Sequence, residues 1–248
     1  MVSSRQRLCV PDDLAVGASV ALSAAHAHYV RHVLRLKAGD AILLFNGRDG
    51  EWRAELAEST KEGQEKRALA LLVRKQLRQQ HCGPDIDYLF APLKRARLDF
   101  MVQKATEMGV ARLRPVLTRR TTATRVNIER LRANAIEAAE QCGILRLPEL
   151  YAPERLESVI SRWPQTRVLI FCDEQSATGD PLAILAGLSP GPLGLLIGPE
   201  GGFDDREREM LSLKPFVVKI SLGPRILRAE TAAIAALALV NAALGDWR

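Results

Sequence analysis

The 248-residue chain has few cysteines, few aromatic residues and no long hydrophobic run, and these shortages exclude several classes of protein. Its four cysteines lie far apart, with no Cys-x-x-Cys pair and no Cys/His spacing of a zinc finger, which predicts reduced thiols and no metal site. The longest apolar stretch, 231–244, contains Asn241 and is shorter than the roughly 20 residues that cross a bilayer. We therefore expect a cytoplasmic protein without a membrane segment.

The common nucleotide-binding motifs are also missing. The chain contains no Gly-x-Gly, which excludes the Rossmann dinucleotide fingerprint, and no Gly-Lys dipeptide, which excludes a phosphate-binding loop of the Walker type. Aromatic residues make up only 5% of the chain, so a broad base-stacking platform for nucleic acid is not expected. Any nucleotide-like ligand must be held in another way, by the backbone of loops.

Basic residues are in excess. Lys and Arg number 35 against 29 Asp and Glu, which gives a formal net charge of +6 and a sequence pI of about 9.4. This balance favours nucleic acid as a partner, while an anionic small ligand and ordinary solubility charge stay open. The hydrophobic share of 47% and the charged share of 26% are those of a globular protein with a real core.

Short strands dominate the first 73 residues. An apolar run at 41–46 is followed by the turn residues 47–50 and by 51–58, where apolar and charged residues alternate as in a half-buried hairpin strand. Further elements expected here are a polar turn at 61–66, a strand at 68–73 and a short helix at 26–35. The pattern is typical of a small β-barrel or sheet.

The composition changes at 74–85, which is rich in Arg, Gln and Lys and closes with Gly83 and Pro84, so we expect domains at 1–73 and 74–248. Strands then alternate with helices, which predicts a mostly parallel sheet covered on both faces. The expected strands are 88–93, 110–117, 168–172, 194–197 and 216–220. The expected helices are 98–108, 128–142, one that starts near Pro153, 181–186, one that starts near Asp204, and 229–244.

Two loops after the carboxy-terminal strands carry unusual residues. Ligands of open α/β sheets bind beyond the carboxyl ends of the strands, where the loops 197–204 and 221–231 are expected. Three glycines in the first loop let the backbone approach a ligand closely. The second loop holds Arg225, Arg228 and Glu230, which an ordinary strand-to-helix turn does not require, although such a turn is the plain alternative for both loops.

These loops carry a family resemblance. The runs Leu-Ile-Gly-Pro-Glu-Gly-Gly-Phe at 196–203 and Leu-Gly-Pro-Arg-Ile-Leu-Arg-Ala-Glu-Thr-Ala at 222–232 resemble the paired motifs of the ribosomal RNA small subunit methyltransferase E family, in the SPOUT superfamily. Shorter matches at 7–10, 32–40, 103–110 and 137–143 extend the resemblance over nearly the whole chain. Members of this family methylate uracil N3 in bacterial 16S ribosomal RNA.

The resemblance implies a PUA-like RNA-binding barrel at 1–73 and a SPOUT-type α/β domain at 74–248 whose chain forms a trefoil knot. It also implies a homodimer that acts on 16S rRNA of the small ribosomal subunit with S-adenosylmethionine as cofactor. The cofactor-binding residues that it implies are Leu196, Ile197, Gly198, Pro199, Glu200, Gly201, Leu222, Gly223, Arg225, Ile226 and Leu227.

The implied reaction moves a methyl group to a neutral imide nitrogen, which is a poor nucleophile. A base must take the N3 proton, or a cation must stabilise the anion that results. We expect Glu230 to be the base or an orienting carboxylate and Arg228 to face a uracil oxygen. The alternative for Arg228 and Glu230 is a salt-linked pair at the start of the last helix. Glu200 either faces the ligand or braces its loop.

RNA contacts are expected mainly through phosphates, from basic side chains of both domains. For each of them a solvated surface charge is the alternative. The candidates are Arg7, Arg31, Arg35, Lys37, Lys94, Arg95, Arg97, Arg119 and Arg120. Two other functions stay open at this point: methylation of another RNA target by the same fold, and a non-catalytic RNA-binding protein of ribosome assembly.

Overall fold

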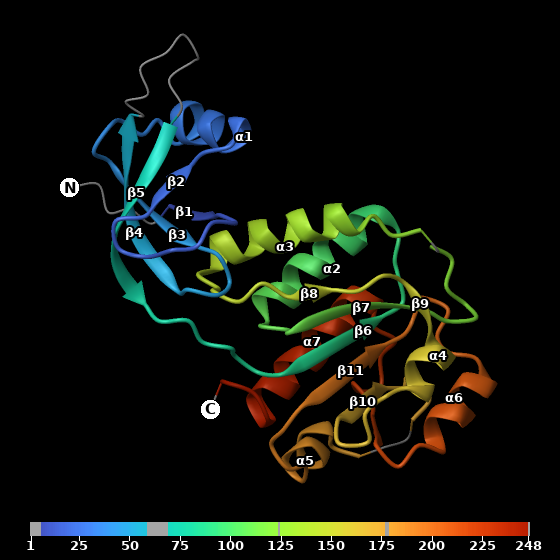
Figure 1. The fold of residues 1–248 in the computed structure, drawn as a ribbon. Helices are drawn as coiled ribbons and strands as arrows, with labels where there is room; N and C mark the ends of the chain where they lie inside the picture. Colours follow the sequence, from blue (N-terminus) through green and yellow to red (C-terminus); the bar gives the residue numbers. More distant parts are fainter. Residues whose placement is uncertain (1–5, 59–68, 124, 177–178, 248) are drawn as a thin grey trace. The chain divides into compact units, whose positions relative to one another are not determined.

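The computed structural model describes residues 6–58, 69–123, 125–176 and 179–247, so the turn expected at 61–66 lies outside the described residues. The chain forms two compact units (Figure 1). The first unit contains Met1–His81 together with Ala139–Leu147, and the second contains Cys82–Ala138 and Pro148–Arg248. The boundary expected after residue 73 falls inside a strand of the first unit, because that strand continues to Arg78.

A five-stranded sheet forms the first unit, in the order β1-β3-β4-β5-β2. β1 and β3 are parallel, and the other neighbours are antiparallel. The hairpin of β3 and β4 confirms the expected strands, and Ile42, Ala54 and Val73 lie in the buried core. The strands are β1 (Arg7–Cys9), β2 (Ser19–Ala21), β3 (Ala41–Phe45), β4 (Glu51–Glu58) and β5 (Leu69–Arg78).

The helix expected at 26–35 is present in two pieces. The hydroxyl of Ser23 accepts a hydrogen bond from the His26 amide at 3.2 Å and caps α1 (Ala24–His28), which continues as a π-helical turn (Tyr29–Val33). Arg35 follows with φ of 55°, the left-handed backbone region. Arg35 and its basic neighbours on either side are exposed, namely Arg31 and Lys37.

Arg7 is buried in the first unit, which corrects the expectation that it contacts RNA. Its Nε donates to Oε1 of Glu51 at 2.7 Å, and its other nitrogens donate to backbone carbonyls that include those of Ala139 and Ile144. The guanidinium carbon also lies 4.3 Å from the centre of the Phe45 ring. With all of these partners inside the unit, Arg7 holds the fold together and is not available to a phosphate.

The second unit is built on a parallel sheet, as the alternation of strands and helices predicts. Its order is β12-β10-β11-β6-β7-β8, with β9 paired to β7, and every pair is parallel. The strands are β6 (Ile86–Phe90), β7 (Arg112–Leu117), β8 (Glu149–Leu150), β9 (Glu154–Arg155), β10 (Val168–Cys172), β11 (Leu193–Ile197) and β12 (Val217–Ile220). The helices are α2 (Arg95–Glu107), α3 (Ile128–Cys142), α4 (Leu156–Ser161), α5 (Pro181–Ala186), α6 (Asp205–Ser212) and α7 (Ala229–Ala243).

Both faces of this sheet are covered, which explains why its central strands β6, β10 and β11 carry no charged residue apart from Asp87. Tyr88 and Leu195 lie in a core with side chains of α2 and α7, while Leu89 and Leu196 lie in a second core with side chains of α4 and α6. Successive residues of a strand point to opposite faces, so each strand contributes to both cores.

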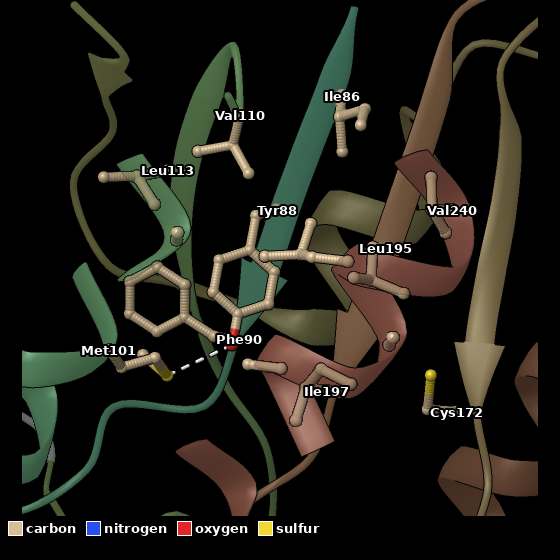
Figure 2. Close-up of a cluster of buried hydrophobic side chains, with 14 of the residues drawn as sticks. Ile86, Tyr88, Phe90, Met101, Val110, Leu113, Cys172, Leu195, Ile197 and Val240 are labelled. Carbon is tan, nitrogen blue, oxygen red and sulfur yellow. Dashed lines mark hydrogen bonds between the residues drawn. The ribbon is translucent and has the colours of Figure 1, made fainter. Parts of the chain in front are cut away.

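Figure 2 shows the first of these cores. The Tyr88 hydroxyl donates a hydrogen bond to the Met101 sulfur at 3.1 Å, which connects β6 to α2 (Figure 2). Burial raises the pKa of Tyr88 well above its ordinary value of 10.0, so the hydroxyl keeps its proton. Tyr88 is fully buried and serves the packing of the core.

Candidate active site

A pocket of about 440 Å³ opens in the second unit where β10, β11 and β12 end. Its walls are residues 172–175 after β10, residues 197–202 after β11, and residues 222, 223 and 225–227 after β12, together with Arg120, Ala229 and Ala232. The volume falls in the range of about 300–1,000 Å³ that is usual for small-molecule sites. The position agrees with the rule that open parallel sheets bind ligands beyond the carboxyl ends of their strands.

The two loops singled out from the sequence come together in this pocket. All of the expected cofactor-binding residues line it except Leu196, which is fully buried and faces the core beneath α4 and α6. Leu196 is therefore a packing residue, because the side chain at that position of β11 points to the opposite face from Ile197. The role of the lining residues as cofactor ligands stays a prediction.

The loop after β11 is fixed at its far end by the first turn of α6. The Asp204 carboxylate accepts from the Glu207 amide at 2.8 Å, and Glu207 accepts from the Asp204 amide at 3.0 Å, which confirms the expected helix start. The other oxygen of Glu207 accepts from the Arg119 amide at 2.8 Å. One buried glutamate thus holds both the glycine-rich loop and the loop that carries Arg120.

Gly198 lies against a buried aromatic ring. A Cβ at this position would stand 2.5 Å from the ring of Phe203, which packs edge-on against Phe171 with the ring centres 4.9 Å apart. Since the ring is fully buried, it has little room to move. The glycine therefore allows the loop to lie close to the core. The contact between Gly198 and the Phe203 ring fixes the position of the pocket wall.

Arg228 and Glu230 flank the lining residue Ala229 at the start of α7. Arg228 is exposed, whereas the Glu230 side chain is 13% exposed, with Oε1 at 3.7 Å from Nε of Arg97. The second oxygen, Oε2, is buried and has no hydrogen-bond partner in the part of the chain that the structure describes. Among the described residues the ion pairs link Glu230 to Arg97 and not to Arg228, so the alternative of a pair between Arg228 and Glu230 is not observed.

Arg97 and Arg120, both expected to contact RNA, have partners at the pocket. Nη1 of Arg97 lies 3.5 Å from Oε1 of Glu200, so Arg97 joins the glycine-rich loop to the start of α7. Nη1 of Arg120 donates to the carbonyl of Gly201 at 2.8 Å. Lys94 and Arg95 are exposed at the start of α2, as a phosphate contact requires, and Arg119 lies 3.4 Å from Asp204.

Sequence reasoning missed the third wall of the pocket. Asp173 and Glu174 follow β10 directly, and both bind the guanidinium of Arg208 on α6. The position of two carboxylates at the end of an apolar strand was the available signal. Cys172 precedes them, and burial raises the pKa of its thiol above the ordinary value of 9.0, so it is no activated nucleophile.

Neither a membrane-spanning helix nor a metal-binding cluster is present among the described residues. None of the described helices has the length and apolar character that crossing a membrane requires. No three of the described His, Cys, Asp or Glu side chains stand in a group that could hold a metal ion.

Family comparisons agree with this architecture. The RNA methyltransferase domain family matches residues 81–241, and the RNA methyltransferase PUA domain family matches residues 22–64. The parallel-sheet unit and its pocket thus define a methyltransferase of the RNA-modifying class, preceded by a PUA domain. A protein of Rickettsia conorii named ribosomal RNA small subunit methyltransferase E is 33% identical over 95% of this chain and 94% of its own length. The chain belongs to the ribosomal RNA small subunit methyltransferase E family.

Solved structures support the same conclusion. A methyltransferase from Legionella pneumophila, in complex with the cofactor SAM, superposes with a TM-score of 0.81 at 30% identity, covering 99% of this chain and 100% of that one. The ribosomal RNA small subunit methyltransferase E of Neisseria gonorrhoeae, bound to S-adenosylmethionine, gives a TM-score of 0.83 at 25% identity, covering 98% and 99%. The expected mixed α/β fold with a parallel sheet, preceded by a PUA domain, is confirmed.

Proposed function

We propose that this protein transfers a methyl group from S-adenosylmethionine to N3 of one uridine in the 16S rRNA of the small ribosomal subunit. The observation that carries the proposal is the pocket in which the loops 197–202 and 222–227 meet, since these loops hold the family motifs. The relatives named ribosomal RNA small subunit methyltransferase E support the substrate class, and the choice of N3 rests on the family resemblance.

The residues of the pocket fit the cofactor. Apolar side chains, including Ile197, Leu222 and Leu227, offer a surface for a purine ring, while loop amides and carbonyls offer hydrogen bonds to polar edges. The carboxylates of Glu174 and Glu200 suit the positive charge of the ligand. When bound, S-adenosylmethionine supplies an activated methyl group on a positively charged sulfur.

Glu230 and Arg228 are assigned complementary roles toward the uracil. The carboxylate of Glu230, whose side chain is 13% exposed next to the lining residue Ala229, accepts the N3 proton or orients the N3–H group. Arg228 is exposed beside it and faces a uracil oxygen, where its charge stabilises the anion that forms when the proton leaves. Arg97 keeps the Glu230 carboxylate in place by its charge.

RNA binding is assigned to exposed basic residues of each unit. Arg31, Arg35 and Lys37 serve in the PUA-like unit, and Lys94 and Arg95 serve in the methyltransferase unit. Since these groups contact phosphates, we expect RNA affinity to fall steeply as salt is raised. A binding constant that barely changes between 50 and 200 mM salt would contradict this assignment. The proposal also includes the trefoil knot and the homodimer that the resemblance implies.

The reaction is tested with small ribosomal subunits from cells that lack the gene. The protein and S-adenosylmethionine are incubated with these subunits, and primer extension is run across the 16S rRNA. Methylation at N3 blocks base pairing, so a new protein-dependent stop at one uridine is the expected result. Label transfer into RNA without a stop would indicate another RNA target or a ribose hydroxyl, and no transfer to any RNA would favour a non-catalytic assembly protein.

A further inference from the structure

The loop after β10 gives the pocket the carboxylate of Glu174, whose contact group on the positively charged ligand the proposed function leaves unassigned. Glu174 lines the pocket with a side chain that is 41% exposed, whereas Asp173 beside it is 4% exposed. Both residues lie on the wall that the family motifs do not cover. Glu174 is therefore positioned to meet a bound molecule, and Asp173 is positioned to serve the fold.

Arg208 fixes the position of Glu174. The Arg208 side chain is 10% exposed; its Nε donates to Oδ1 of Asp173 at 3.0 Å, and its Nη2 donates to Oε1 of Glu174. The same Asp173 oxygen accepts from the Gln175 amide at 3.2 Å, which closes the loop. The remaining nitrogen of Arg208, Nη1, is buried; it has no hydrogen-bond partner among the described residues and lies 3.7 Å from Oδ1 of Asp205. A buried guanidinium that binds two successive carboxylates holds their loop in one conformation.

The glycine-rich loop leaves space for this carboxylate. A Cβ at Gly202 would overlap Oε1 of Glu174, and the φ of +68° at Gly202 is one that side chains rarely adopt. Arg208 lies six residues further along, on the helix that this loop enters. The two loops thus fit each other around the Glu174 carboxyl group.

The wall after β10 carries an excess of negative charge. Asp173 and Glu174 share the single guanidinium of Arg208 and keep one negative charge on this wall, while the other charged lining residues are Arg120, Glu200 and Arg225. Oε1 of Glu174 is the oxygen that binds Arg208, so Oε2 is the atom free to meet a ligand. A carboxylate held rigidly at a pocket wall attracts a cation at little entropic cost.

We infer that Glu174, positioned by Arg208, binds a positively charged group of the methyl donor and is a specificity-determining residue of the pocket. The inference rests on the proposed function. The donor carries two groups of this chemistry, the amino acid ammonium and the sulfonium. Its demethylated product keeps the ammonium and has lost the charge on sulfur.

The test measures binding by calorimetry, with S-adenosylmethionine and S-adenosylhomocysteine as separate ligands. In Glu174→Gln, which keeps the side chain's size, we expect the donor to bind about five- to tenfold more weakly. Glu209→Gln is the matched control, because Glu209 is an exposed glutamate of the same α6 that carries Arg208. It removes an equal charge outside the pocket and should leave both affinities unchanged.

The comparison of the two ligands identifies the group. A loss confined to the donor supports contact with the sulfonium, and an equal loss for both ligands supports contact with the ammonium. If the wild type binds the donor and Glu174→Gln binds it with the same affinity, the inference is overturned. The proposed function would not be affected by that result. Failure of the wild-type protein to bind the donor would instead contradict the proposed function.

Two variants test whether Arg208 positions Glu174. The first replaces Arg208 by another basic residue, and the second moves the Glu174 carboxylate while leaving Arg208 in place. Arg208→Lys keeps the charge but cannot bind Asp173 and Glu174 together, so donor affinity should fall as in Glu174→Gln. Gly202→Ala should have the same effect, because its methyl group displaces the Glu174 carboxylate without removing it. Donor affinity equal to wild type in both folded variants would overturn the positioning role.

Discussion

The two ends of the parallel sheet use the same kinds of charged side chain in opposite ways. At the amino ends, Nη1 of Arg112 lies 2.5 Å from both Asp85 and Asp87, and Arg114 and Arg167 complete the cluster at 2.7 and 2.9 Å. At the carboxyl ends, Arg97 lies 3.5 and 3.7 Å from its two partners and Arg228 is exposed. The carboxyl ends also contain one closely paired set, in which Arg208 binds Asp173 and Glu174. Closely paired charges stabilise the fold or hold a loop in place, and charges left partly unpaired are available to a ligand.

The largest effect on stability is expected at the amino end. Asp87 has a side chain that is only 3% exposed and accepts from Arg112 and Arg114. We expect Asp87→Asn to lower the free energy of unfolding by about 3 kcal/mol, because two guanidinium groups lose their shared partner. Urea unfolding measures the change. In Glu149→Gln, where the lost carboxylate is 63% exposed and 3.7 Å from Arg112, the change should stay below about 0.5 kcal/mol.

At the carboxyl end the expected loss is in rate and not in stability. Arg228→Ala should slow methyl transfer by about 100-fold or more, since a cation that meets developing charge is removed. The free energy of unfolding should move by less than about 0.5 kcal/mol, because the side chain is exposed. Single-turnover transfer and urea unfolding are measured together, with the exposed Arg206→Ala on α6 as the control. A rate equal to wild type would remove Arg228 from the mechanism.

Gly198→Ala should combine the two kinds of effect. Its Cβ would stand 2.5 Å from the buried Phe203 ring, so the loop or the ring must shift, at a cost of about 1–3 kcal/mol in unfolding free energy. The same shift moves the pocket wall and should weaken donor binding in calorimetry. Gly191→Ala serves as control, because a Cβ there meets nothing within 4 Å. If Gly198→Ala bound the donor as the wild type does, the wall would not depend on this contact.

The smallest effect is a pH dependence of the amino end. Burial opposes ionisation of Asp85, but hydrogen bonds and charge from Arg167 and Arg112 outweigh it and hold the pKa of this carboxyl below its ordinary value of 3.8. A lowered folded-state pKa stabilises the protein above the unfolded-state pKa, and this contribution is lost as pH falls through the folded-state value.

Unfolding free energies measured from pH 7 down to about pH 3 test this dependence. Asp85→Asn should flatten the acid side of the curve by less than about 1 kcal/mol, because the carboxylate is 38% exposed and screened by solvent. The control is Asp180→Asn at the exposed start of α5. This variant keeps a side-chain oxygen for the helix-capping contact that Asp180 makes. Identical acid slopes in wild type and Asp85→Asn would contradict the assignment.

Local patterns predicted most of the second unit. Asp180 is the N-cap of α5 and Pro181 is its first residue, which are positions that these residue types favour. The apolar run 168–172 has the same bounds as β10. The polar half of β5 was not predicted, because Lys75 and Gln76 are held in the strand by pairing with β4, a partner that composition does not reveal. Strand pairing is a tertiary property and overrides local polarity.

The burial of certain charged residues was the other feature that local sequence patterns did not predict. The excess of basic residues predicts Arg7 on an RNA-binding face of the first unit, yet its partners in the structure lie as many as 137 residues away. Asp173 and Arg208 are 35 residues apart and meet only in the folded chain. A sequence shows that such charges exist, while their partners depend on how the chain folds. The glycine loops could be found because their chemistry is local.

The first unit depends on a segment encoded far from the rest of it. Ala139–Leu147 belongs to the unit formed by the first 81 residues, and its carbonyls receive the buried Arg7. A recombination event that moved only residues 1–81 into another gene would leave this segment behind and leave Arg7 without acceptors. Changes in the first unit must therefore stay compatible with a stretch of chain that begins inside α3, a helix of the second unit.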